Sequence, residues 1–260
     1  MNLRLATPAD DPGLVALMQR VAMPGPMRLS FGCQPSFFRA LRVEGGDPVV
    51  VVAEEGGEIV GAGTATTRRA YLNGEVAVLR YLSALRIDPR ARRSTTLARG
   101  YALLTRELST RPASLTFTSI LADNTPALAH LAAGRRSLPA YEPLHTCVTR
   151  IFPVARARRR STDASGIAVG SASAAEIAGF LHHHGPARNF FPVVGASDLA
   201  GAEDSATPGL CADDIAVARD RRASAACWAA GTSCPGVRCS WQATPRGCAP
   251  PDPASTPSPV

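Results

Sequence analysis

The chain has 260 residues, enough for one large domain or two small ones. Its hydrophobic content of 45% supports a folded core, and its net charge of +7 comes from 28 basic residues, all of them arginine, against 21 acidic ones. No stretch approaches the ~20 apolar residues that a membrane span needs, and the N-terminus lacks the apolar segment of a signal peptide. We therefore expect a cytoplasmic protein with reduced thiols, and the Ala-, Gly-, Arg- and Pro-rich composition suggests a bacterial gene.

The positive charge does not by itself indicate a nucleic-acid partner. Much of it falls in residues 90–99 and 156–160, and neither cluster is interleaved with aromatic side chains. The first cluster suits a phosphorylated small ligand, and the second suits a solvated linker. The sequence thus disfavours a nucleic-acid binder.

Hydrophobic periodicity and turn signals predict a mixed α/β sheet that is largely antiparallel at its start. Asn73-Gly74 marks a tight turn between two strands. The expected elements are a strand over 3–6, a helix over 12–21, a loop over 22–35, a helix over 36–43, strands over 49–53 and 58–68, segments over 65–72 and 75–87 on either side of that turn, a helix over 95–108, a strand over 114–120, a helix over 126–133 and a last strand over 141–152.

The segment Tyr81–Leu104 carries the strongest functional signal, because it combines a strand, an Arg-rich turn and a long helix. A helix N-terminus presents unpaired backbone N–H groups and the positive end of the helix dipole, which together bind phosphate or pyrophosphate. Arginine side chains suited to phosphate add to this site, namely Arg90, Arg92, Arg93 and Arg99.

This order of elements, with the Arg-rich turn, resembles the GNAT acyltransferase superfamily over residues 1–152 and more faintly over 166–222. The family pattern Arg/Gln-x-x-Gly-x-Gly/Ala falls on Arg92–Leu97. The resemblance implies a GNAT-like mixed sheet flanked by helices. It also implies direct transfer of an acetyl group from acetyl-CoA to a primary amine on a small molecule or peptide, without a metal.

The resemblance also implies which residues bind acetyl-CoA. They are the strand residues Leu85, Arg86 and Ile87, the turn residues Arg92, Arg93, Ser94, Thr95, Thr96 and Leu97, and Asn124 at the next helix. Thr95 and Leu97 stand where the family has glycine, which lets the backbone approach the pyrophosphate closely, so we expect weakened binding. Asn124 is equally explained as a helix N-cap.

The acid and base are harder to place. Acetyl transfer to an amine needs a base for the amine and an acid for the leaving thiolate. Leu131 occupies the position where the family usually has a tyrosine, so Tyr141 is the substitute acid and Glu142 the base, with Glu75 as another available carboxylate. The alternatives are a packed strand-edge tyrosine and solvated surface glutamates.

The domain boundaries follow from composition and a weak repeat. We expect a GNAT acyltransferase domain over 1–153, an Arg-rich linker over 154–165, a partial second GNAT-like unit over 166–222 and an irregular tail over 223–260 without a return strand. A change of reading frame near residue 223 or a disordered tail would each produce such a segment. Neither the three adjacent histidines at 182–184 nor the cysteine spacings favour a metal site.

A second functional hypothesis remains open. The same fold could serve as a ligand-sensing or partner-binding module that has lost efficient catalysis, as Thr95, Leu97, Leu131 and Ala84 suggest. Under the enzyme hypothesis, the loop 22–35 contributes to the acceptor pocket. The sequence does not predict an oligomeric state.

Overall fold

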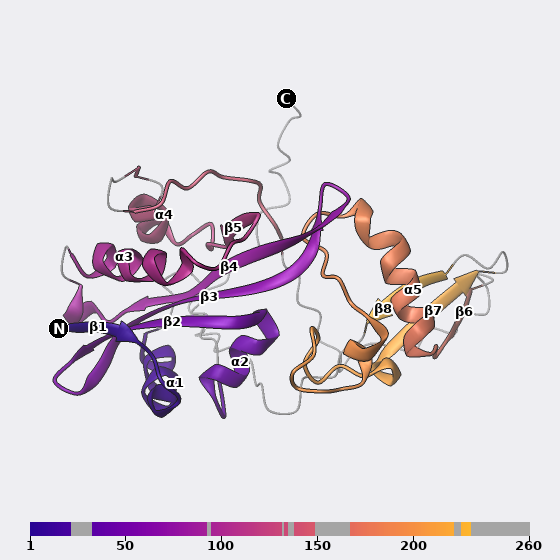
Figure 1. Cartoon of the computed structure of the whole chain (residues 1–260), viewed down its shortest axis with the longest axis horizontal. Helices are drawn as coiled ribbons and strands as arrows, with labels where there is room; N and C mark the ends of the chain where they lie inside the picture. Colours follow the sequence, from indigo (N-terminus) through magenta and orange to yellow (C-terminus); the bar gives the residue numbers. More distant parts are fainter. Residues whose placement is uncertain are drawn as a thin grey trace, which may run out of the picture.

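A computed structural model describes residues 1–21, 33–92, 95–131, 133–134, 138–148, 167–220 and 225–229. In these residues the chain forms a five-stranded sheet and a separate three-stranded sheet, each with its own helices (Figure 1). The strands are β1 (Asn2–Leu5), β2 (Gly46–Glu55), β3 (Glu58–Leu72), β4 (Glu75–Ile87), β5 (Leu115–Thr118), β6 (Ile167–Gly170), β7 (Ile215–Asp220) and β8 (Ala225–Ala229). The α-helices are α1 (Asp11–Arg20), α2 (Phe37–Glu44), α3 (Thr96–Leu108), α4 (Thr125–Leu131) and α5 (Ala174–His184).

The five-stranded sheet has the mixed, largely antiparallel form that the sequence predicts. Its strand order is β1-β2-β3-β4-β5. The first four strands pair antiparallel in succession, whereas β5 pairs parallel to β4 after the crossover through α3. Helices α1 and α2 cover one face of this sheet, and α3 and α4 cover the other (Figure 1).

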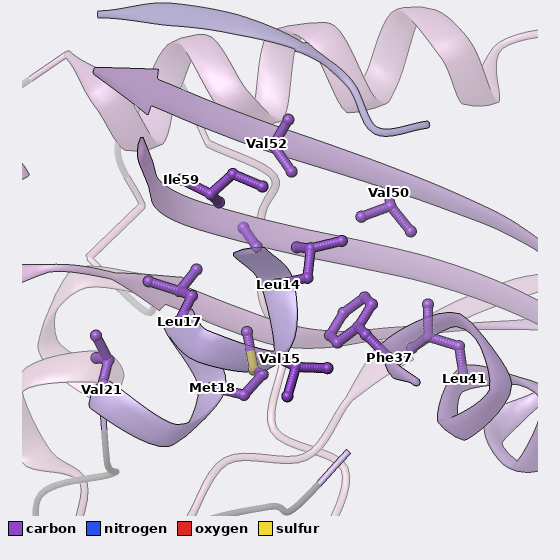
Figure 2. Close-up of a cluster of buried hydrophobic side chains, with 11 residues drawn as sticks. Leu14, Val15, Leu17, Met18, Val21, Phe37, Leu41, Val50, Val52 and Ile59 are labelled. Atoms are coloured by element: carbon purple, nitrogen blue, oxygen red, sulfur yellow. The ribbon is translucent and has the colours of Figure 1, made fainter. Parts of the chain in front are cut away.

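Alternation along β2 explains why helices cover both faces. Val50 and Val52 pack with Leu14, Leu17 and Phe37 beneath α1 and α2 (Figure 2). Val49 and Val51, which alternate with these two valines along β2, pack with Leu104 of α3 instead. Successive side chains of a strand point to opposite faces, so an unbroken valine run is buried on both sides.

The β3–β4 hairpin is longer than the rest of the sheet. Asn73 and Gly74 both have positive φ values, 53° and 87°, as the predicted two-residue turn requires. The two strands pair from Leu72 and Glu75 inward, while β2 pairs with β3 only as far as Thr67. The outer end of the hairpin therefore projects past β2.

The last strand predicted for 141–152 is wrong over its described part. Residues 141–148 have no regular secondary structure, and 149–152 lie outside the described residues. Pro143 in this stretch and Pro139 just before it have no backbone N–H, so neither position can donate a hydrogen bond to a sheet. Leu144 and Val148 remain largely exposed.

The second sheet shares an order of elements with the start of the first. In both, the first strand is followed by a helix and then pairs antiparallel with the next strand, β6 with β7 as β1 with β2. Strand β8 pairs antiparallel with β7, so the expectation that no return strand follows residue 222 is wrong. A second GNAT-like copy remains a prediction. No helix in the described part of the chain is long and apolar enough to cross a bilayer.

Candidate functional site

The candidate site lies where β4 separates from β5. The two strands pair over only four residues, Leu79–Leu82 with Leu115–Thr118, and the Thr118 hydroxyl donates to the Leu82 carbonyl at 2.8 Å. Beyond Leu82, β4 continues to Ile87 with β3 as its strand partner. We call residues 83–87 of β4 the splay, because in the described structure their other edge has no strand beside it. Such an edge can hydrogen-bond an extended ligand.

A β-bulge at Ala84 opens the splay. Ser83 pairs with Thr64 and Arg86 with Ala62, so Ala84 and Leu85 together face Gly63 of β3. Ala84 has a φ of 50°, a left-handed conformation that costs an L-residue free energy. Bulges bend a strand and re-aim its side chains, which is why they are common beside functional sites.

A buried polar cluster sits beside the bulge. The Ser83 hydroxyl donates to a carboxylate oxygen of Glu44, the last residue of α2, and lies 2.6 Å from the Thr64 hydroxyl. Burial raises the pKa of Glu44, although the Ser83 bond and the positive charge of Arg68 oppose the shift. A half-buried carboxyl group with a raised pKa, placed where two strands separate, is suited to proton transfer.

Gly45 fixes the end of α2 at this place. A β-carbon at Gly45 would lie 2.6 Å from the Thr67 carbonyl oxygen of β3, closer than real side chains come. The backbone after Glu44 therefore approaches β3 as only glycine allows. This close approach holds the Glu44 carboxylate over the sheet.

Tyr81 lies on the same face of β4 as Ser83, two residues earlier. Its hydroxyl is 2.6 Å from the Ser119 hydroxyl, just past the end of β5. Burial raises the pKa of Tyr81, the Ser119 bond lowers it, and the nearby Glu44 charge raises it further. Tyr81 is thus held as a protonated hydrogen-bond donor beside Glu44.

The predicted phosphate turn is only partly described. Helix α3 begins at Thr96, and Thr95 before it has a φ of −98°, a conformation open to any residue. The Thr96 hydroxyl is buried and donates to the Ala91 carbonyl at 3.4 Å, so it ties the turn to the helix. Arg92 and Arg99 are exposed near this helix end, whereas Arg93 and Ser94 lie outside the described residues.

Arg90 has a structural role that the sequence did not reveal. Its guanidinium bonds the Asp88 carboxylate at 2.9 Å and the Glu58 carboxylate at 3.3 Å. Asp88 is buried and also accepts a 3.0 Å bond from Arg20 of α1. Arg90 therefore clamps the turn after β4, and a role for its charge at a phosphate stays a prediction.

The remaining predicted cofactor-binding residues lie in the last part of β4 and at the start of α3. The Leu85 carbonyl accepts a 2.8 Å bond from Arg86, and the Ile87 carbonyl accepts a 3.3 Å bond from Arg92. Ile87 packs against a small core cluster, and Leu97 is half-buried at the start of α3. Burial lowers the pKa of Arg86, which pairs across from Ala62.

Asn124 acts as the N-cap of α4. Its side-chain carbonyl accepts a 3.3 Å bond from the Ala127 backbone N–H, and its backbone carbonyl accepts one from Leu128 at 3.1 Å. The capping interpretation is therefore confirmed. The bond to Ala127 uses the amide oxygen, and a cofactor contact by Asn124 stays a prediction.

Tyr141 bonds to α3 rather than to the Glu44 cluster. The Tyr141 hydroxyl lies 2.7 Å from the hydroxyl of Tyr101, which belongs to α3 on the opposite face of the sheet from α2 (Figure 1). Burial raises the pKa of Tyr141, while its bond to Tyr101 lowers it. Glu142 is exposed.

Sequence reasoning missed Glu44, Ser83 and Tyr81 as a group. Ser83 and Tyr81 lie in the segment that carried the main signal, but Glu44 is 39 residues from Ser83. The only local signal was the pair Gly45-Gly46 after Glu44, which marks a helix end without specifying what that end contacts.

The strand order and the separation of β4 from β5 agree with the family resemblance. The fold is GNAT-like. No family model and no curated protein matches the chain, but 157 chains of solved structures do. One is an aminoglycoside 6'-N-acetyltransferase from Acinetobacter haemolyticus, with 14% identity, 57% of this chain and 100% of that chain covered, and a TM-score of 0.40.

Two further matches are a second N-acetyltransferase and a protein named as a transcriptional regulator. Glucosamine-6-phosphate N-acetyltransferase from Arabidopsis thaliana has 15% identity, covers 58% of this chain and 98% of its own, and has a TM-score of 0.42. A transcriptional regulator from Bacillus halodurans has 18% identity, covers 58% and 99%, and has the same TM-score of 0.42. Likeness at this distance does not choose an activity, so the function must come from this chain's own residues.

Proposed function

We propose that the chain is an N-acyltransferase that moves an acetyl group from acetyl-CoA to a primary amine by direct attack. The observation that carries this proposal is the half-buried Glu44 carboxylate, bonded to Ser83 at the point where β4 leaves β5. A thioester ligand lying along the splay would have a proton acceptor beside it. That combination is what amine acylation needs.

The residues around the splay fit acetyl-CoA. The free edge of β4 offers backbone groups to the pantetheine amides, and the N-terminus of α3 offers unpaired N–H groups to the pyrophosphate. Arg92 and Arg99 add exposed positive charge nearby. When bound, acetyl-CoA supplies the activated acetyl group; the protein orients it and handles the protons.

Glu44 takes the proton that the amine loses. Its raised pKa brings it closer to that of a base working near neutral pH than an exposed glutamate would be. The Ser83 hydroxyl donates to the carboxylate, and the Thr64 hydroxyl in turn contacts that of Ser83. Tyr81 remains protonated and can donate a hydrogen bond or a proton to the leaving sulfur.

Tyr141 and Glu142 remain the sequence-based proposals for the same roles. Tyr141 faces α3, and Glu142 is exposed to solvent. Glu142 thus lacks the half-buried setting that distinguishes Glu44. The two pairs of residues therefore give opposite expectations for matched variants.

The test is calorimetric titration of the full chain with acetyl-CoA, followed by free-thiol release over a panel of primary amines. Glu44→Gln and Tyr81→Phe should abolish or strongly reduce thiol release while leaving acetyl-CoA binding intact. Glu142→Gln and Tyr141→Phe are the matched controls and should retain activity. Loss of activity in the second pair alone would transfer the catalytic roles to Tyr141 and Glu142.

A non-catalytic ligand-binding module is the second candidate. The engagement of Arg90 by Asp88 and Glu58 favours it, because this arginine is already neutralised at the turn. Binding of acetyl-CoA without thiol release from any amine would support this alternative.

A further inference from the structure

The C-terminal unit, residues 167–220, docks on the projecting end of the β3–β4 hairpin (Figure 1). The Tyr71 N–H donates to the Phe191 carbonyl at 2.9 Å, and the Phe190 N–H donates to the Tyr71 carbonyl at 2.8 Å. The Val193 N–H donates to the Arg69 carbonyl at 3.1 Å. Since β2 ends its pairing at Thr67, residues 190–193 occupy the edge of β3 that β2 leaves.

Side chains of the hairpin and of α2 reinforce this docking. The Tyr71 ring meets the His182 ring of α5 edge-on at 6.3 Å, and a β-carbon at Gly185 would lie 2.5 Å from the Tyr71 ring. Arg39 of α2 forms an ion pair with Glu203. The C-terminal unit is thus fixed beside α2, the helix that ends in Glu44.

A row of three rings connects the C-terminal unit to the candidate site. Phe190 and Phe117 have ring centroids 5.0 Å apart, and Phe117 and Tyr81 have centroids 5.1 Å apart. Tyr81 and Phe117 are direct partners in the β4–β5 pairing, so they share the face on which Ser83 meets Glu44. All three rings are half-buried and keep some surface available.

Phe190 holds its place in the row at a conformational cost. Its φ is 67°, in the left-handed region that bulky L-residues avoid. Asn73 and Asp47 also have positive φ, but their residue types tolerate it. A strained bulky residue persists only where its surroundings impose the conformation, and such residues cluster at functional sites.

We propose that the C-terminal unit forms one wall of the acceptor site and that Phe190, with Phe117 and Tyr81, receives the ring of an aromatic primary amine whose ammonium group faces Glu44. This inference rests on the proposed acyltransferase function. The chemistry is complementary at both ends: three rings offer an apolar contact for a flat group, and the carboxylate offers a partner for the cation. Phe190 is a specificity-determining residue, since it acts on the acceptor's ring and not on the reacting nitrogen.

The test compares 2-phenylethylamine with n-butylamine, two primary amines that differ in the ring. Binding of each to the full chain is measured by calorimetry, and acetyl transfer to each is measured by thiol release. Wild type should bind 2-phenylethylamine more tightly, and Phe190→Ala should weaken that binding roughly two- to tenfold, the range that one aromatic pair contributes. Butylamine binding should not change.

Two further variants separate ring loss from misfolding. Phe190→Gly removes the ring and also the backbone strain, because glycine accepts a φ of 67°. This variant should lose the preference for the aromatic amine, and its thermal midpoint should be equal to or higher than that of Phe190→Ala. Phe180→Ala is the matched control: this ring of the same unit stacks on His184, with centroids 4.4 Å apart, and should leave both amines unaffected.

The two proposals fail in different ways. Acetyl transfer could be equally fast to both amines and unchanged in the Phe190 variants. That result would refute the role of Phe190 in the acceptor site but would still support the acyltransferase function. Ring-selective binding that depends on Phe190, without any acetyl transfer, would support the wall and overturn the acyltransferase. If both amines bind equally to wild type and to the Phe190 variants, the proposed role of Phe190 in the acceptor site is refuted, whether or not acetyl transfer is observed.

Discussion

Glu44→Gln is the sharpest test of the candidate site, because it changes the proton chemistry and almost nothing else. Glutamine has the size of glutamate, and its side-chain carbonyl can still accept the hydrogen bond that Ser83 donates. It cannot take up a proton at working pH. The Ser83–Thr64 contact at 2.6 Å should therefore survive while base catalysis is lost.

The expected loss follows from the role. General-base catalysis by a positioned side chain contributes about 10²–10⁴-fold to the rate, equal to ~3–5 kcal/mol of activation free energy. We expect kcat/KM for amine acetylation to fall within that range, with the dissociation constant for acetyl-CoA unchanged. Glu142→Gln, on an exposed residue, should leave both quantities near wild type.

The pH dependence of the acetylation rate tests the role of Glu44 independently. The pKa of Glu44 is raised by burial, so in wild type the rate should rise with pH through a value above the ordinary 4.5 of glutamate. That limb should be absent in the Glu44→Gln variant. A limb unchanged between the two proteins would assign the base elsewhere.

Stability should move in the opposite direction from activity. A raised folded-state pKa means that the folded protein holds the proton more tightly than the unfolded chain, so this group's contribution is fully present below the unfolded pKa near 4.5 and is lost as pH rises through the folded pKa. Urea unfolding should thus show Glu44→Gln at least as stable as wild type at pH 8. Clear destabilisation at pH 8 would refute the reasoning, because it would make Glu44 a structural anion.

Variants at four other positions test the surrounding structure. Ala84→Gly should change the free energy of unfolding by less than about 1 kcal/mol, since relief of left-handed strain of ~1 kcal/mol offsets the lost burial of one methyl group of ~0.8 kcal/mol; Ala84→Val, measured by the same urea titration, should lose clearly more. Asp88→Asn should lower the thermal midpoint at pH 7, and the gap to wild type should begin to narrow below the unfolded pKa of 3.8, because Arg90 and Arg20 lower the pKa of Asp88 and its stabilisation is lost as pH falls through that lowered pKa. Thr95→Gly should tighten acetyl-CoA binding in calorimetry, because glycine lets the backbone approach the pyrophosphate more closely. The Thr95 side chain makes no capping bond, so its loss should leave α3 intact. Phe37→Ala should destabilise by ~3–5 kcal/mol in urea, as Phe37 is 1% exposed in the main core.

Local chemistry explains why much of the fold could be predicted from the sequence. Asn73-Gly74 determines the hairpin because its two residues accept positive φ, and the valine run of β2 is buried on both faces because strand side chains alternate. Both signals act within a few residues. The failed strand at 141–152 shows the limit of such signals: its β-branched residues favoured a strand, but two nearby prolines limit sheet donors and Tyr141 bonds Tyr101 of α3.

The candidate site depends on contacts that local signals do not carry. Glu44 reaches Ser83 across 39 residues because Gly45 lets α2 end against β3. Arg90 was expected near a phosphate, but its guanidinium forms an ion pair with Asp88, two residues before it. Phe190 reaches Phe117 only because the C-terminal unit pairs with the hairpin, a contact that no pattern within either segment indicates.

The two ends of the central strands show how the site and the docking are related. An unpaired sheet edge invites pairing with other chains, and proteins cover or disrupt such edges. The edge of β3 beyond Thr67 is covered by residues 190–193 of the same chain. The edge of β4 beyond Leu82 is instead disrupted by the bulge at Ala84 and, in the described structure, has no strand laid on it. An edge that the chain protects with a strained alanine, while covering its neighbour, is best explained as a surface kept for a ligand.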